Sequence, residues 1–373
     1  MLRRQNVASD EVREGTRIMH QSEQPVLPAG KHGARPIEQS AGSQGTASRV
    51  HQHDTACIHP RTSAERSACS RRVKSGEYLR VFRGLYAQAD TWNGSGEVEH
   101  VRLIARSLAD MHPQWVFCHF TAAAIYGLEI GRDLALPLHV QMPRGGRRHA
   151  DSDILRHQPT CSNPTTWEGV RVTPPAQTVI DCLLELPFAR GLAIADSALR
   201  VLGLTKELLT DELNRRGDVP RRALVADVVS YADSRAANGG ESVARAVMIE
   251  QGFMLPDLQF EVHDPLNPKA TYYVDYRWHL ATGDVFGELD GKDKYVDPEM
   301  TGGRGVLEVM VGERHREARL TTSGARVLRF TFRDAVDAGA PVSTARAVRD
   351  SKRPGSRYGY VTHRTRPGCV VPR

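Results

Sequence analysis

The sequence predicts a multidomain α/β protein of the mixed α+β kind, and three observations support this class. The chain has 373 residues, which is enough for two or three domains that each bury a core. Segments with helical spacing of apolar residues recur between short segments in which apolar and polar residues alternate. The last third of the chain follows the order helix, three strands, helix, strand. We therefore expect an amino-terminal helix with a two-stranded ribbon, a mixed α/β middle region, and a carboxy-terminal mixed sheet flanked by helices.

Changes in composition divide the chain into five segments. Residues 1–55 contain few aliphatic side chains, so we expect them to be disordered or to reflect a start codon assigned too far upstream. Residues 56–92 read as a helix and a ribbon, and residues 93–220 as a mixed α/β region. Residues 221–348 form the expected carboxy-terminal domain, and residues 349–373 are expected to be a disordered basic tail.

The placement of charges, cysteines and apolar residues argues against a disulfide-stabilised or membrane-spanning protein. The net charge is +6, and the segment from Arg61 to Arg83 carries seven basic residues against two acidic ones. The six cysteines show no C-x-x-C pair or regular spacing, so neither a disulfide framework nor a zinc site is predicted. No apolar run reaches the length of a membrane span or forms the core of a signal peptide. We expect a cytoplasmic protein with no membrane partner.

The segment 56–92 has the features of a DNA-binding unit. Thr62 and Glu65 form a helix-capping pattern, and Gly76 is expected to end that helix. Two strands follow, joined by a turn at Arg83 and Gly84. A helix followed by a basic ribbon is the layout of a winged helix-turn-helix. The residues expected to contact DNA phosphates are Arg71, Arg72, Lys74, Arg80 and Arg83. The alternative is an ordinary solvated basic surface.

The middle region is expected to alternate helices and strands. The expected helices cover Glu99–Met111, His119–Leu128, Ala176–Leu186 and Ala193–Arg200. The expected strands cover Leu138–Met142 and Val170–Pro175. His119 and Asp181 are polar residues within these helices, and either a catalytic role or a structural role in capping or buried hydrogen bonding fits them.

Acidic residues gather in the expected carboxy-terminal sheet. Side chains alternate across a strand, so Glu288 and Asp290 share one face of a short, half-buried strand. Pairing with the preceding strand would bring Asp275 beside them, and Glu241 lies in the first turn of the helix before the sheet. Oxygen ligands of this kind suit Mg²⁺. The alternative is a simple edge strand that ends in a turn at Asp290 and Gly291.

The order of these elements resembles the PD-(D/E)xK nuclease superfamily, in particular its very-short-patch-repair-endonuclease-like branch. The runs that carry this resemblance are Glu288-Leu-Asp-Gly-Lys-Asp-Lys-Tyr295, Glu313-Arg-His-Arg-Glu-Ala-Arg-Leu320 and Gly324-Ala-Arg-Val-Leu-Arg329. The upstream region is similar to AbiEi-type antitoxins of type IV toxin-antitoxin systems. The matching runs there are Val81-Phe-Arg-Gly-Leu-Tyr-Ala87, His119-Phe-Thr-Ala-Ala123, Val172-Thr-Pro-Pro-Ala-Gln-Thr178 and Asp196-Ser-Ala-Leu-Arg200. The resemblance covers about Thr62 to Ala347, and over this range the chain looks like actinobacterial proteins of unassigned role that join these two parts.

The resemblance implies a role for each acidic and basic residue of the carboxy-terminal domain. Asp275 and Glu288 would be magnesium ligands, and Glu241 a third ligand or a contact to a metal-bound water. The superfamily pattern places a lysine two residues after the acid, where this sequence has Asp290. Lys292 or Lys294 would supply that amine from the following turn. Arg316 and Arg329 would contact phosphate groups of the nucleic acid.

Two functions follow as hypotheses. The first is a DNA-associated protein whose carboxy-terminal domain is a Mg²⁺-dependent endonuclease hydrolysing phosphodiester bonds. The second is a non-catalytic antitoxin or transcriptional regulator that binds promoter DNA, with a nucleotidyltransferase-like toxin as its partner. A third and weaker idea is a structural or protein-interaction module that binds no nucleic acid.

Overall fold

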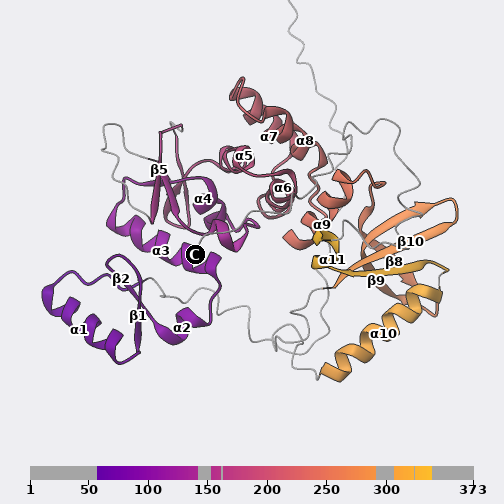
Figure 1. The fold of residues 1–373 in the computed structure, drawn as a ribbon, viewed down its shortest axis with the longest axis horizontal. Helices are drawn as coiled ribbons and strands as arrows, with labels where there is room; N and C mark the ends of the chain where they lie inside the picture. The colour runs from indigo at the N-terminus through magenta and orange to yellow at the C-terminus, as the bar shows by residue number, and fades with distance from the viewer. Residues whose placement is uncertain (1–56, 142–152, 161–162, 291–305, 323, 338–373) are drawn as a thin grey trace, which may run out of the picture. The chain divides into compact units, whose positions relative to one another are not determined.

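The structure is a computed structural model that describes residues 57–141, 153–160, 163–290, 306–322 and 324–337 (Figure 1). Lys292 and Lys294 lie outside these ranges, as do the expected terminal segments 1–55 and 349–373. Within the described ranges the chain is a mixed α/β protein with three separate sheets, which confirms the predicted class.

The first three amino-terminal elements follow the predicted order: α1 (Ser63–Lys74), β1 (Tyr78–Phe82) and β2 (Leu85–Gln88). Helix α2 (Ala89–Asn93) comes next and was not predicted. The capping box is present, because the Thr62 side chain accepts from the Glu65 N–H and the Glu65 carboxylate accepts from the Thr62 N–H. Gly76 adopts a φ of 79°, which a glycine tolerates at the turn after the helix. β1 and β2 pair antiparallel as a hairpin.

The middle region contains a five-stranded sheet with the order β5-β4-β3-β7-β6. Its strands are β3 (Val116–Phe117), β4 (Leu138–Gln141), β5 (Ile154–His157), β6 (Thr165–Trp167) and β7 (Val170–Val172). The helices around it are α3 (Glu97–Met111), α4 (His119–Tyr126), η1 (Arg132–Leu134), α5 (Pro175–Glu185), α6 (Phe188–Leu202), α7 (Lys206–Arg215) and α8 (Arg222–Tyr231). The four predicted helices and both predicted strands are confirmed, whereas β3, β5, β6, η1, α7 and α8 were not predicted.

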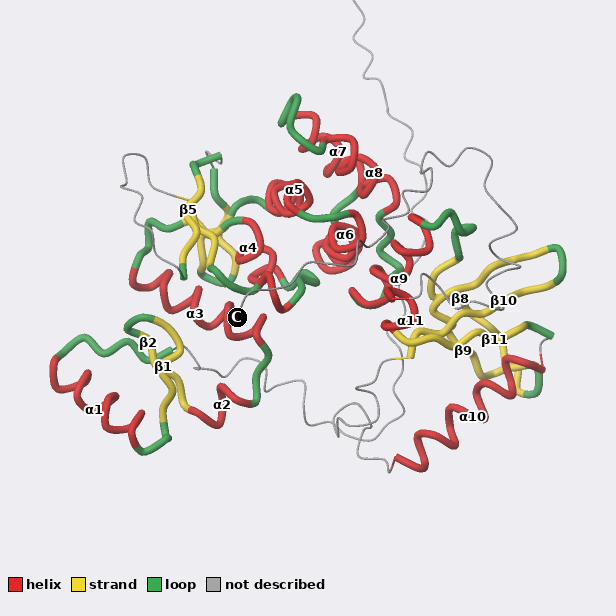
Figure 2. Tube along the Cα trace, in the orientation of Figure 1, coloured by secondary structure: helices red, strands yellow, loops and turns green. Residues whose placement is uncertain are grey.

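The carboxy-terminal part begins with a helix and continues as a four-stranded sheet with the order β11-β10-β9-β8 (Figure 2). Its elements are α9 (Gly239–Glu250), β8 (Asp257–Asp264), β9 (Asn267–Leu280), β10 (Gly283–Asp290), α10 (Val306–Thr322), β11 (Arg326–Thr331) and α11 (Phe332–Asp337). β9 pairs antiparallel with β8 and β10, and β11 pairs parallel with β10. Helix α10 packs against β8 and β11, and α11 packs against α9. The predicted element order is confirmed up to β11, and α11 is an addition.

The prediction of a half-buried strand at β10 is wrong. Its central residues are all buried, namely Val285, Phe286, Gly287 and Glu288. Val285 packs in one apolar cluster with Trp278, and Phe286 packs in another with Leu320 of α10. Helices therefore cover the strand on both sides, and Glu288 lies in the interior.

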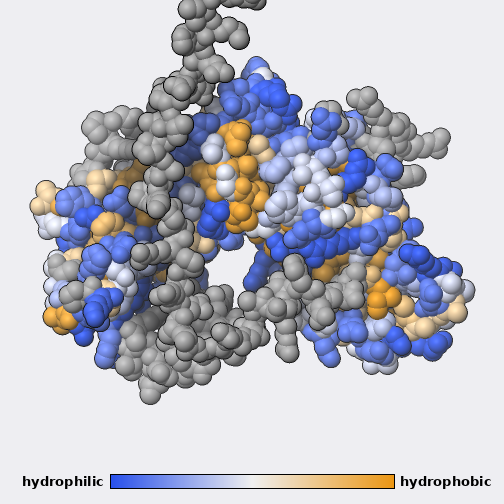
Figure 3. All heavy atoms as spheres, turned by 180° about the vertical axis from the view of Figure 1, so that it is seen from behind, coloured by the Kyte–Doolittle hydropathy of each residue, from blue (hydrophilic) through white to orange (hydrophobic). Residues whose placement is uncertain are grey.

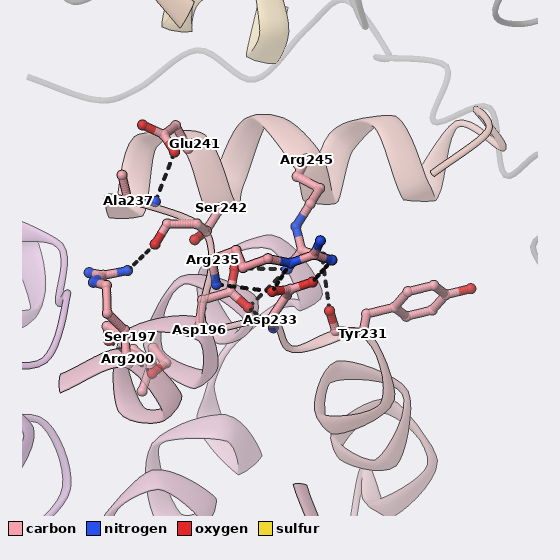
Figure 4. Close-up of polar contacts among 12 residues, drawn as sticks. Asp196, Ser197, Arg200, Tyr231, Asp233, Arg235, Ala237, Glu241, Ser242 and Arg245 are labelled. Carbon is pink, nitrogen blue, oxygen red and sulfur yellow. Dashed lines mark hydrogen bonds and ion pairs between the residues drawn. The ribbon is translucent and has the colours of Figure 1, made fainter. Parts of the chain in front are cut away.

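Helix α9 contributes to two apolar cores. Ala246 and Ile249 belong to the large core of the middle region, while Ala244 and Met248 pack in the core beside the carboxy-terminal sheet. Arg245 of this helix is buried and pairs with Asp196 of α6 (Figure 4). The helix thus joins the middle region to the sheet through apolar packing and one buried ion pair.

Hydrophilic side chains cover much of the face drawn in Figure 3, with hydrophobic patches between them. None of the helices in the described ranges combines the length and the apolar character needed to cross a membrane.

Candidate functional site

Two carboxylates predicted to act together share one hydrogen-bonding partner in the structure. Glu241 lies in the first turn of α9, and Asp275 lies on β9. The Gln259 side chain of β8 donates from Nε2 to Glu241 Oε2 at 3.2 Å and to Asp275 Oδ1 at 3.4 Å. The other oxygen of Asp275 accepts from the Leu289 N–H at 2.8 Å. The structure therefore brings Glu241 and Asp275 together beside the end of β10.

Gln259 was missed by sequence reasoning. Its backbone has a φ of 46°, in the left-handed region that residues with a β-carbon seldom adopt. Such conformations persist where surrounding contacts hold them, and they concentrate at functional sites. The only signal in the sequence was a polar residue between two apolar ones, Leu258 and Phe260.

Glu288 is paired with a helix-borne arginine. Its side chain is 7% exposed, and Arg316 Nη2 of α10 lies 2.9 Å from Glu288 Oε1. The same Arg316 nitrogen donates to the Tyr273 carbonyl. A charge buried in this way requires a partner. Arg316, predicted to contact phosphate, is therefore held against a carboxylate of the candidate site.

Asp290 takes part in a second charged group at the end of β10. Arg329 Nη1 lies 3.4 Å from Asp290 Oδ1, and Arg329 Nε lies 3.6 Å from a carboxylate oxygen of Glu317. Residue 290, where the superfamily pattern has a lysine, thus places a carboxylate next to an arginine on the neighbouring strand. Arg329, like Arg316, contacts an acid of the same domain.

Glu241 also has a structural role. Asn238 caps α9 and accepts from the Glu241 N–H at 3.0 Å. The Glu241 carboxylate accepts from the Ala237 N–H at 2.8 Å (Figure 4). It also accepts from Asn238 Nδ2 at 2.7 Å. These bonds satisfy donors that the start of a helix leaves free. They hold the carboxylate in one orientation toward Gln259.

A different group of side chains is spaced more closely for a metal ion. In the described part of the chain, one set of three or more His, Cys, Asp or Glu residues has its ligand atoms all within 4.8 Å of one another: Cys118, His119 and His157. The carboxylates of Glu241, Asp275 and Glu288 do not form such a set. Cysteine spacing gave no signal for this set, because it combines one cysteine with two histidines, one of which comes from a different element.

The basic residues predicted to contact DNA lie on the last turn of α1 and on the β1–β2 hairpin. All five are exposed, and they are Arg71, Arg72, Lys74, Arg80 and Arg83. Arg72 also stacks over the Tyr78 ring at 5.0 Å and lies 3.7 Å from Glu77. The other four are exposed at one helix end and on its adjoining ribbon.

Comparison with known proteins places the chain in a family. No family model matches the sequence, and no solved structure matches it. Two relatives are the "Uncharacterized protein MT2308" and the "Uncharacterized protein Rv2248" of two Mycobacterium tuberculosis strains, CDC 1551 / Oshkosh and H37Rv. Each is 31% identical over 210 residues, which is 55% of this chain and 72% of the relative. The chain belongs to the same family as these two mycobacterial proteins.

Proposed function

We propose that this is a DNA-associated protein whose carboxy-terminal domain is a Mg²⁺-dependent endonuclease that hydrolyses phosphodiester bonds. The observation that carries the proposal is the link from Glu241 through Gln259 to Asp275, next to the strand end that bears Glu288. These residues come from a helix and three consecutive strands of one mixed sheet.

The donor set fits a hard divalent cation. Mg²⁺ binds oxygen ligands and is held in proteins through carboxylates together with water. Asp275 and Glu288 would hold the ion, with Glu241 as a third ligand or a contact to one of its waters. When bound, Mg²⁺ polarises the scissile phosphate and lowers the pKa of a bound water.

The remaining residues of the site have roles that follow from their contacts. Gln259 orients Asp275 and Glu241 by bonding to both. Arg316 keeps a positive charge beside Glu288, and Arg329 keeps one beside Asp290. These two guanidinium groups attract the phosphate backbone to the site. Lys292 or Lys294, which follow β10 in the sequence, would orient the attacking water together with Asp290.

The proposal is tested by incubating the full chain with double-stranded DNA, single-stranded DNA and RNA, each with Mg²⁺ or with EDTA. We expect cleavage of DNA that requires Mg²⁺ and is lost in Glu288→Gln. The matched control is Glu261→Gln, because Glu261 is an exposed carboxylate of the same sheet. Absence of cleavage with Mg²⁺, or cleavage that Glu288→Gln leaves unchanged, contradicts the proposal.

A second candidate function is DNA binding without cleavage, as in an antitoxin or transcriptional regulator with a toxin partner. Four exposed cations on α1 and the hairpin favour it, namely Arg71, Lys74, Arg80 and Arg83. It requires no metal at the carboxylate site, where Arg316 already neutralises Glu288. Binding to the protein's own promoter DNA with no metal-dependent cleavage would select this candidate.

The triple variant Arg71→Ala, Arg80→Ala, Arg83→Ala is expected to bind DNA more weakly than the wild type. Each lost phosphate contact should reduce the magnitude of the slope of log binding constant against log salt concentration by about 1. The slope for the triple variant should therefore be smaller than that of the wild type by about 3. Fluorescence anisotropy at several salt concentrations measures this slope. Arg132→Ala removes one arginine that is 82% exposed and lies in η1, outside the basic surface, and serves as the control. An unchanged affinity and slope in the triple variant would exclude this surface from DNA binding.

A further inference from the structure

A compact group of metal-ligating side chains lies in the middle region, on elements other than those of the carboxylate site. Cys118 is the N-cap of α4 and follows β3 directly, and His119 is the first residue of that helix. His157 is the last residue of β5. The candidate ligand atoms of these three side chains all lie within 4.8 Å of one another.

His119 has the contacts of a metal-bound histidine. Its side chain is 13% exposed, and its Nε2 lies 3.3 Å from a carboxylate oxygen of Glu185 on α5. Its Nδ1 is buried and has no hydrogen-bonding partner among the described atoms. Histidines that bind a metal commonly give their second ring nitrogen to a carboxylate, which fixes the ring. Nδ1 is therefore the nitrogen left for a metal.

The backbone of His119 supports the same interpretation. Its φ is 48°, in the left-handed region, at the junction between β3 and α4. Residues with a β-carbon are held in this region only where surrounding contacts impose it, and such residues cluster at functional sites. The strained junction places Cys118 and His119 side by side at the start of the helix.

His157 is held by a further histidine. His139 of β4 is 4% exposed, and its Nδ1 lies 2.9 Å from His157 Nε2. The rings of His119 and His157 stack at 3.8 Å between centroids. The rings of His119 and His139 also stack, with 5.5 Å between their centroids. The three imidazole rings therefore form one packed group beside Cys118.

The mixture of donors selects the type of ion. Cys118 is fully buried and carries a free thiol. A thiolate with two imidazoles suits zinc, which is bound by sulfur and nitrogen in tetrahedral sites, better than it suits Mg²⁺ or Ca²⁺.

We propose that Cys118, His119 and His157 bind one Zn²⁺ ion, with Glu185 and His139 as positioning residues for the two histidines. Binding replaces the thiol proton of Cys118, which passes to solvent, and forms one Zn–S and two Zn–N bonds. The fourth tetrahedral position is taken by water or by an added ligand. This site is independent of the proposed nuclease function.

The test uses the purified full chain and two metals. Elemental analysis after reconstitution with Zn²⁺ and gel filtration should give one equivalent of zinc per chain. Replacement of zinc by Co²⁺ should give a thiolate-to-cobalt charge-transfer band in the near ultraviolet, together with the visible bands of tetrahedral cobalt.

Variants locate the ligands. Cys118→Ser should abolish the charge-transfer band, and His157→Gln should reduce zinc retention below one equivalent. His139→Gln removes a positioning residue and should weaken zinc affinity roughly 10–100-fold. The control is Cys182→Ser, because Cys182 is a fully buried free cysteine outside the group. It should leave both stoichiometry and spectrum unchanged.

Wild-type protein that retains no zinc and gives no charge-transfer band overturns the proposal. A band that survives Cys118→Ser or disappears in Cys182→Ser also overturns it, since the sulfur ligand would then be a different cysteine. If Cys118→Ser does not fold, the wild-type stoichiometry and the graded losses in His157→Gln and His139→Gln decide the question.

Discussion

Replacement of Asp275 by Asn is expected to lower the rate of Mg²⁺-dependent DNA cleavage roughly a thousandfold, because a metal ion contributes several kcal/mol to stabilising the transition state. The substitution removes the negative charge that a divalent cation requires. It keeps an oxygen that can accept from the Leu289 N–H, the bond that joins Asp275 to β10 at 2.8 Å. The fold should therefore be retained while the activity is lost.

The rate is measured under single-turnover conditions with saturating protein, and folding is checked by circular dichroism. Asp257→Asn is the matched control, because Asp257 is an exposed carboxylate of the neighbouring strand β8 that pairs with Arg277 at 3.8 Å. It should change the rate less than twofold, within roughly ±0.5 kcal/mol for such surface positions. Equal rates for Asp275→Asn and Asp257→Asn would show that Asp275 has no special part in cleavage.

The second large effect concerns stability. Arg245 Nη2 lies 2.9 and 2.8 Å from the two carboxylate oxygens of Asp196, and both side chains are buried (Figure 4). Arg245 Nη1 also donates to the Tyr231 carbonyl at 3.0 Å, and the Asp233 N–H donates to Asp196 at 2.7 Å. Asp196→Leu would leave the arginine buried without its counter-charge. We expect the free energy of unfolding to fall by about 3–5 kcal/mol.

The double variant Asp196→Leu, Arg245→Met separates the interaction from the burial of the charges. Two apolar side chains of similar volume should recover most of the loss, because neither charge then remains unpaired. Urea denaturation of the wild type, both single variants and the double variant gives the coupling energy. Arg235→Ala, which breaks a more exposed pair with Asp233 at 2.8 Å, should cost about 1 kcal/mol or less. If Asp196→Leu or Arg245→Met were as stable as Arg235→Ala, the buried ion pair would not be what joins α6 to α9.

Local sequence signals predicted much of the fold. The capping box at Thr62 and Glu65, the glycine at 76 and the turn at Gly84 identified α1 and the hairpin, because caps and turns depend on a few neighbouring residues. Alternation identified β9 and β10 as strands, and their pairing as neighbours places Asp275 beside the end of β10, as the sequence suggested it would if they paired. The winged helix-turn-helix itself stays a prediction, since the structure describes one helix before the hairpin.

Other features depend on contacts between distant segments and had no local signal. β5 and β6 are three or four residues long, and such short strands carry little periodicity. The burial of Glu288 depends on α10, whose Arg316 neutralises it. Gln259 donates to the carboxylates of Glu241 and Asp275, and its backbone has a positive φ that residues with a β-carbon seldom adopt. The proposed zinc ligands had no local signal, because His157 comes from a strand that was not predicted.

The most direct test of the proposed nuclease site is a titration of the full chain, first saturated with zinc, with Mn²⁺ followed by electron paramagnetic resonance. Mn²⁺ substitutes for Mg²⁺ at oxygen-ligand sites. The account predicts saturable binding in the wild type and in Glu261→Gln, and loss of that binding in the variant Asp275→Asn, Glu288→Gln. Equal Mn²⁺ binding in the wild type and the Asp275, Glu288 variant would contradict a metal site at these carboxylates.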